Sequence, residues 1–85
     1  MTLICADDVR AFEVFFERHS EIAFSLAMRT LNDRAQAADA TQEAFLAVWR
    51  NRASYQPERG SARSWLLGIV RNRAIDAWRR ESRGQ

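Results

Sequence analysis

The segment "WLLGIVRNRAIDAWRR", residues 65–80, decides the fold that the sequence predicts. It has no proline, and its apolar residues recur at helical spacing, so it predicts an α-helix over residues 62–80. On a helical wheel the apolar residues form two arcs. One arc contains Trp65, Leu66, Ile69, Val70 and Ala77, and the other contains Leu67, Ala74, Ile75 and Trp78. A helix that is apolar on two sides packs between layers or presents one side to a partner.

The same segment carries four arginines, and this reflects an uneven distribution of charge along the chain. Residues 1–49 contain four arginines and eight acidic residues, a net charge of −4, whereas residues 50–85 contain nine arginines and three acidic residues, a net of +6. Every basic residue apart from the single histidine is arginine, which suits bidentate contacts with phosphates. The polarity indicates two surfaces for two partners, the second an anionic polymer, although a generic solvated surface explains the counts as well.

Two further helices precede this segment. Residues 8–31 predict a helix capped by Asp7 or Asp8, and "LNDR" predicts the turn after it. Residues 36–52 predict the second helix. The expected buried positions of the first helix are Val9, Phe12, Phe15, Phe16, His19, Ile22, Ala23, Leu26, Ala27 and Thr30. Those of the second are Ala38, Thr41, Ala44, Phe45, Val48 and Trp49, with Asp39, Glu43, Ala47 and Arg50 opposite and Gln42 and Leu46 at the edges.

A loop is predicted over residues 53–61, because Pro57 and Gly60 interrupt the helical pattern and Ser61 suits the N-cap of the last helix. Together these elements predict a single all-α domain of 85 residues, a compact bundle of three or four helices. Cys5 is the only cysteine, so no internal disulfide is expected, and an inert thiol is the preferred interpretation. No apolar run reaches the ~18 residues of a membrane span, so a soluble, unexported chain without membrane insertion is expected.

Residues suited to enzyme chemistry are few. His19 lies within an apolar stripe and is interpreted as a hydrogen-bonded core histidine, in preference to a base or a ligand. No cysteine and histidine cluster has metal-ligand spacing, and no glycine-rich loop precedes a helix, so neither a metal, a cofactor nor an enzyme activity is expected. The acidic pair Asp39 and Glu43 is a solvated face unless a partner binds it.

The last helix instead favours nucleic-acid binding. Arg71 and Arg73 flank Asn72, and arginine neutralises phosphates while asparagine contacts base edges. Further arginines on this helix are Arg63, Arg79, Arg80 and Arg83, and the aromatic rings available for base stacking are Tyr55, Trp65 and Trp78. Two alternatives stay open at this point: Trp65 as a core residue and Arg59 as a merely solvated one.

These patterns resemble region 2 of bacterial sigma factors of the extracytoplasmic-function (ECF) group. "QAADATQEAFLAVWRN" (36–51) is similar to the family's acidic "DAEDLVQEVFLRLW", and "WLLGIVRNRAIDAWRR" is similar to "WLxxIARNxAIDxxRR", with "PERG" (57–60) between them. The resemblance extends from about Ala11 to Arg80. It implies an alternative sigma factor, bacterial, cytoplasmic and nucleoid-associated, with core RNA polymerase, promoter DNA and an anti-sigma factor as partners.

The resemblance also implies residue roles. The acidic helix docks on the coiled coil of the largest polymerase subunit, a role that falls on Asp39, Gln42, Glu43, Leu46 and Arg50. The loop and last helix recognise and melt the −10 element and hold one flipped base of its non-template strand. Asn72 aligns with the base reader, Tyr55 to Ser61 form the lip of its pocket, and Trp65 is a candidate stacking platform. The candidate contacts with the DNA backbone are Arg63, Arg71, Arg73, Arg79 and Arg80, and Arg59 is a further DNA-binding candidate within the loop.

Two departures from the family pattern matter. Ala40 and Thr41 stand where the family usually has Leu-Val, which makes the docking helix less apolar. The family's second domain, region 4, which reads the −35 element, does not follow residue 85, so a fragment or an incomplete paralogue is expected. A helix-turn-helix-like regulator of duplex DNA and a helical protein-interaction adaptor are the alternative functions. For a sigma domain, the second apolar side of the last helix, with Leu67, Ile75 and Trp78, is expected to meet region 4, an anti-sigma factor or the polymerase.

Overall fold

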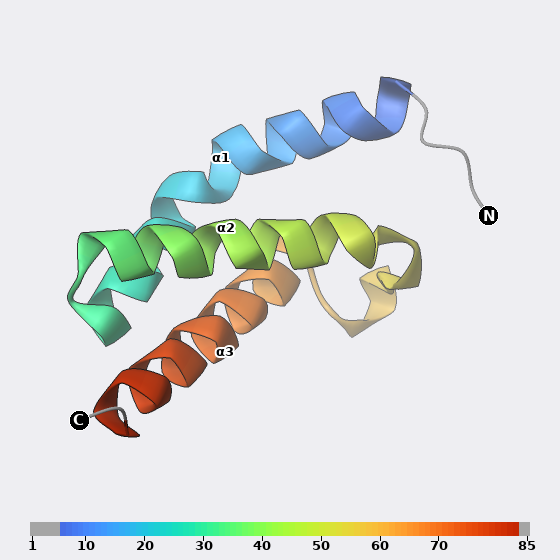
Figure 1. Cartoon of the computed structure of the whole chain (residues 1–85). Coiled ribbons are helices and arrows are strands. Elements are labelled where there is room, and N and C mark those ends of the chain that lie inside the picture. The colour runs from blue at the N-terminus through green and yellow to red at the C-terminus, as the bar shows by residue number, and fades with distance from the viewer. Residues whose placement is uncertain (1–5, 84–85) are drawn as a thin grey trace.

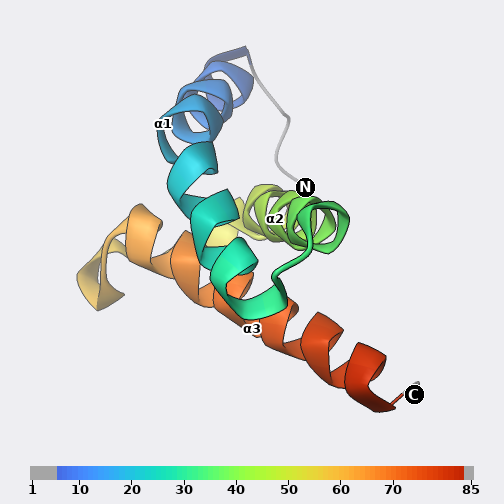
Figure 2. The ribbon, with the colours of Figure 1, turned by 90° about the vertical axis from the view of Figure 1, so that its left-hand side faces the viewer.

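The computed structural model describes residues 6–83 and shows three α-helices (Figure 1). Helix α1 is Ala6–Leu31, α2 is Arg34–Arg50 and α3 is Ala62–Arg83, with the short 3-10 turns η1 (Arg52–Ser54) and η2 (Pro57–Arg59) between α2 and α3. Residues 6–83 contain no strand, which confirms the all-α prediction. Each helix packs on the other two, and a view nearly along α2 shows α1 and α3 crossing beside it (Figure 2).

The turn between α1 and α2 is set by Asn32 and Asp33. Asn32 has a left-handed backbone (φ 55°), and its N–H donates to the carbonyl of Met28 at 2.8 Å, which ends α1. Asp33 is extended, and its carboxylate accepts a hydrogen bond from the N–H of Gln36 at 2.9 Å. Because Asp33 is the N-cap, α2 begins at residue 34, two residues before the predicted start.

Helix α2 also ends two residues earlier than predicted, because side chains bond its last carbonyl groups. Both the backbone N–H and the side-chain amide of Asn51 donate to the carbonyl of Ala47, at 3.0 and 2.8 Å. The Arg52 guanidinium donates to the carbonyl of Trp49 at 2.5 Å and lies 3.8 Å from the centre of its ring. Residue 52 therefore belongs to η1, and the predicted loop contains two ordered 3-10 turns.

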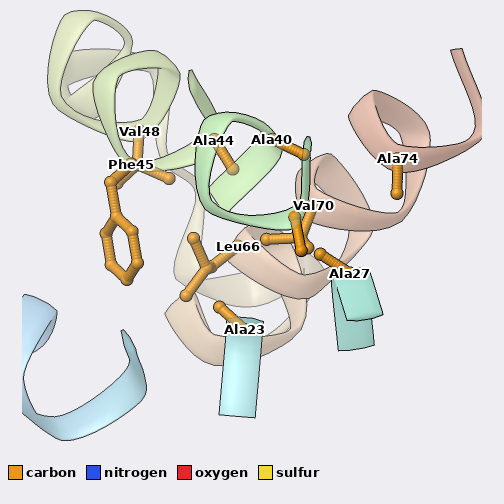
Figure 3. Packing of buried hydrophobic residues seen from close by; sticks show 10 residues of the cluster. Ala23, Ala27, Ala40, Ala44, Phe45, Val48, Leu66, Val70 and Ala74 are labelled. Atoms are coloured by element: carbon orange, nitrogen blue, oxygen red, sulfur yellow. The ribbon is translucent and has the colours of Figure 1, made fainter. Parts of the chain in front are cut away.

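The core lies where the three helices meet. The buried cluster consists of Ala23, Ala27, Ala37, Ala40, Ala44, Phe45, Val48, Leu66, Val70 and Ala74 (Figure 3). Leu66 and Val70 are its largest fully buried side chains. Complete burial stabilises the fold by roughly 1.5–3 kcal/mol for each such residue. Phe45 and Val48 are the other large members, and alanine at the remaining six positions lets the helix backbones approach closely.

The N-terminal half of α1 extends beyond this core (Figure 1). Phe12 and Phe15 pack edge-on against Phe45, with ring centres 6.2 and 6.0 Å apart. Val9 and Phe16, however, are 40% and 44% exposed, so the prediction that they are buried is wrong. Helix α3 does not cover this half of α1, because it crosses α1 further along (Figure 1).

Four other predictions of local structure are also wrong. Helix α1 already begins at Ala6, so neither Asp7 nor Asp8 precedes it as a cap. Ile22 is 36% exposed at the edge of the α1 stripe. In α2, Ala38 is exposed and Ala47 is buried, although Thr41, Ala44, Phe45 and Val48 are buried as predicted. In α3, Ala74 is fully buried with Leu66 and Val70, because both α1 and α2 cover this side.

Candidate functional site

The outer face of α2 carries the five residues predicted to bind polymerase. Asp39, Gln42, Glu43, Leu46 and Arg50 are all exposed, whereas Ala40, Thr41, Ala44 and Val48 point into the bundle. Their spacing of three and four residues places them on one stripe of the helix. Leu46 is 41% exposed in the middle of this stripe. An apolar residue surrounded by charged and polar ones is typical of a protein-binding surface.

The unusual pair Ala40 and Thr41 lies on the opposite, buried side of α2. The Thr41 hydroxyl donates to the carbonyl of Ala37 at 2.7 Å, so its burial leaves no unpaired donor. The departure from the family pattern therefore affects helix packing, and the exposed stripe is unaffected.

A pocket of about 370 Å³ lies between the loop after α2 and the start of α3. It is lined by Ser54, Tyr55, Gln56, Arg59, Gly60, Ser61, Ser64 and Trp65. The structure thus brings together four of the predicted DNA-binding residues: Tyr55, Arg59, Ser61 and Trp65. Ser54, inside the predicted loop, and Ser64, in the predicted last helix, also line the pocket and were not predicted as site residues, because no motif of the sequence includes them.

Two contacts of Tyr55 hold the wall of this pocket. Its ring stacks on Trp65, with centres 5.4 Å apart and planes at 21°, and its hydroxyl donates to the carbonyl of Gly60 at 3.0 Å. Gly60 has φ 142°, a conformation that residues with a side chain rarely adopt. Tyr55 therefore closes the six-residue loop 55–60 onto α3, and one face of its ring is already occupied by Trp65.

Ser61 starts α3, as predicted. Its hydroxyl accepts a hydrogen bond from the N–H of Ser64 at 3.1 Å, and its carbonyl accepts from the N–H of Trp65 at 3.0 Å. The side chain of Ser61 is thus engaged in capping, and its contribution to the pocket is to fix where α3 begins.

Asn72 lies outside the pocket lining, on the same side of α3 as Trp65. Seven residues advance a helix by nearly two full turns, so Trp65, Asn72 and Arg79 follow one line along α3, with a rise of about 10 Å between successive members. Asn72 and Arg79 are exposed. Arg71, also exposed, lies about 100° around the helix from Asn72.

Arg73 and Arg80 face a different surface from Asn72. Both line a groove of about 180 Å³ between α2 and α3, whose other lining residues include Asp39 and Glu43. Arg73 is half-buried, and its Nε is buried without a hydrogen-bond acceptor among the described residues. The structure thus separates these two arginines from the pocket and from Asn72.

Arg63 lies near α1. Burial lowers the pKa of His19 below its usual 6.5, and the charges of Arg63 and Arg18 lower this pKa further. His19 is half-buried and packs edge-on against Phe15, with ring centres 4.7 Å apart. Arg63 therefore lies on the α1 side of α3, apart from Arg73 and Arg80.

Over the described residues 6–83, no helix is long and apolar enough to cross a membrane, and no group of three or more potential metal ligands occurs. An all-helical domain with an acidic face on one helix and an arginine-rich face beside a pocket has the charge distribution of a module that bridges a protein and an anionic polymer.

The comparisons with known proteins define that module. The Sigma-70 region 2 family matches residues 15–84, and the chain belongs to this family. It is 40% identical over 74 residues to the ECF RNA polymerase sigma factor SigK of Mycolicibacterium vanbaalenii, covering 87% of the chain and 38% of that protein. It is 36% identical over 81 residues to SigK of Mycobacterium bovis and of Mycobacterium tuberculosis, covering 95% of the chain and 43% of each relative. No solved structure matches the chain significantly.

The chain therefore spans about two fifths of the length of these curated relatives: 38% of one and 43% of the other two. The family membership confirms the predicted resemblance to region 2 of an ECF sigma factor.

Proposed function

We propose that this domain acts in transcription initiation: the outer face of α2 binds core RNA polymerase, and the loop pocket with α3 captures one strand of the promoter −10 element. The observation that carries the proposal is the separation of the two surfaces in a chain of this family. The acidic stripe with Leu46 and the aromatic pocket lie on different elements. A bridging domain needs such a separation, because both partners must bind at once.

On the DNA side, the proposed mechanism is capture of an unpaired base. The pocket of about 370 Å³ is walled by stacked Tyr55 and Trp65. Extruding a base from the duplex costs a few kcal/mol, and stacking on an aromatic side chain returns ~1–3 kcal/mol. Asn72 contacts the edge of a neighbouring base further along α3, while Arg59, Arg71 and Arg79 contact phosphates. Melting follows from selective binding of the single strand, without bond cleavage by this chain.

The proposed role places the domain in the bacterial cytoplasm, at the nucleoid. It also provides a position for a regulatory partner such as an anti-sigma factor. Trp78 is 53% exposed near the end of α3, and an exposed tryptophan beside arginines is a common anchor for protein partners.

The first experiment measures binding of the 85-residue chain to bacterial core RNA polymerase. The test variant is Asp39→Arg/Glu43→Arg, and the matched control is Glu13→Arg/Glu17→Arg, which reverses two exposed acids at the same spacing on α1. We expect the test variant to lose at least about tenfold in affinity and the control to stay within about twofold of the original chain. Equal binding by all three chains would refute docking through α2.

The second experiment tests the DNA side. Complexes of the chain with core polymerase select promoter fragments from a library randomised over the −10 segment. The selected segment is then offered as single strand and as duplex. We expect preference for the single strand. Preference of the free chain for intact duplex would instead favour a regulator of the helix-turn-helix kind. Binding without any base preference would favour the protein-interaction adaptor.

A further inference from the structure

We infer that Arg73 and Arg80 belong to the polymerase-docking surface together with Asp39 and Glu43, and that this composite surface takes a coiled-coil segment of polymerase that carries charges of both signs. This inference rests on the proposed function. It extends the docking face from α2 across the α2–α3 groove and removes two arginines from the DNA face.

The spacing of residues on α3 gives the first argument. The adjacent arginines Arg79 and Arg80 are about 100° apart around the helix, so they serve different faces. Arg80 is seven residues from Arg73, and both line the α2–α3 groove. Arg79 is seven residues from Asn72, on the side of Trp65. The "RR" pair at residues 79–80 is therefore divided between two surfaces.

The groove gives the second argument. Its α2 wall carries Asp39 and Glu43, and its α3 wall carries Arg73 and Arg80. At its end, the Gln36 side chain donates a hydrogen bond to the carboxylate of Glu81, which ties the start of α2 to the end of α3. The two walls are thus held together as one surface, with Asp39 and Glu43 on the α2 side and Arg73 and Arg80, beside Glu81, on the α3 side.

Charge complementarity decides which partner fits. DNA that entered this groove would bring its phosphates beside Asp39 and Glu43, which repel them. A protein segment with a basic residue opposite α2 and an acidic residue opposite α3 complements both walls. Arg73 is half-buried and lines this groove beside the exposed Arg80. A carboxylate of the partner that enters the groove can pair with the guanidinium groups of these two residues.

The test compares Arg80→Ala with Arg79→Ala, two neighbouring exposed arginines whose removal changes the net charge equally. Core polymerase binding is measured for both variants and for Asp39→Arg/Glu43→Arg. Binding of each chain to the selected −10 single strand is measured in parallel. We expect Arg80→Ala to weaken core binding about tenfold and to leave single-strand binding within about twofold, whereas Arg79→Ala does the reverse.

Arg73→Lys provides a second variant, because lysine keeps the charge at this half-buried position but loses the planar fork. We expect Arg73→Lys to bind core polymerase more weakly and to keep the midpoint temperature of thermal unfolding. The inference is overturned if Asp39→Arg/Glu43→Arg abolishes core binding while Arg80→Ala and Arg73→Lys do not weaken it. If the acidic variant itself binds core normally, docking through α2 fails and the inference fails with it.

Discussion

Replacement of Tyr55 by phenylalanine isolates one hydrogen bond of the loop pocket. The variant keeps the ring that stacks on Trp65 at 5.4 Å and loses only the hydroxyl that donates to the Gly60 carbonyl at 3.0 Å. A neutral hydrogen bond contributes a net ~0.5–1.5 kcal/mol. Because this bond is at the surface and water can replace it, we expect the low end, about 0.5–1 kcal/mol, which is a roughly two- to fivefold change in an equilibrium constant.

The lost bond acts on the closed form of loop 55–60, so the effect should appear in DNA binding. We expect Tyr55→Phe to bind the selected −10 single strand about two- to fivefold more weakly and to bind core polymerase normally. Tyr55→Ala also loses the stack, worth about 0.5–1.5 kcal/mol beyond buried area, and should bind the strand more weakly still. The measurement is fluorescence anisotropy with a labelled oligonucleotide.

The matched control is Asp33→Ala, which removes the cap of α2, a side-chain hydrogen bond of 2.9 Å far from the pocket. It should lower the free energy of unfolding by about 1 kcal/mol and leave strand binding unchanged. If Tyr55→Phe binds DNA like the original chain, or if Asp33→Ala weakens DNA binding equally, the loop is not preorganised by Tyr55 and the reasoning is refuted.

Four further predictions follow from positions described above. Leu66→Ala leaves a cavity at a fully buried site and should lower the free energy of unfolding by about 2–5 kcal/mol. Because a domain of this size has a total stability of only ~3–5 kcal/mol, urea titration should find the variant largely unfolded. In Gly60→Ala the added methyl group meets no atom within 4 Å, but the backbone φ of 142° is strained for alanine by about 1–3 kcal/mol. The variant should bind the oligonucleotide more weakly in fluorescence anisotropy and keep its helical circular dichroism. The lowered pKa of His19 means that the unfolded chain binds more protons, so stability should fall as pH drops below 6.5, and thermal melts of His19→Gln should lack this part of the pH dependence. Asn72→Ala should lose ~1–3 kcal/mol at one promoter base and little at others; uniform loss in selection experiments would contradict base reading.

The helices and the two chemically different surfaces could be predicted from the sequence, because they follow from local periodicity and charge. The stripe of Asp39, Glu43 and Leu46 depends on the sequence of α2 alone. Ser61 caps α3 by accepting a hydrogen bond from the N–H of Ser64, only three residues later. The family could also be recognised from the sequence, because each of its two motifs is a contiguous segment.

Features that depend on how helices cross could not be predicted. Ala74 appeared to belong to an outward arc of α3, but α1 and α2 together bury it. The helical spacing predicts that Phe16 is buried, but its side chain is 44% exposed, because α3 crosses α1 further along. The groove that joins Arg73 and Arg80 to Asp39 also arises only from the packing of α2 on α3.

The small size of the core side chains has a consequence for how such domains diversify. Six residues of the described ten-residue core cluster are alanine, and the close packing of the helices depends on them. Enlarging one of these side chains would force two helices apart, whereas substitutions at Gln56, Arg59 or Asn72 alter exposed or pocket-lining positions with little effect on stability. Under the proposed function, promoter preference can thus change through single substitutions at such positions, without a compensating change in the core.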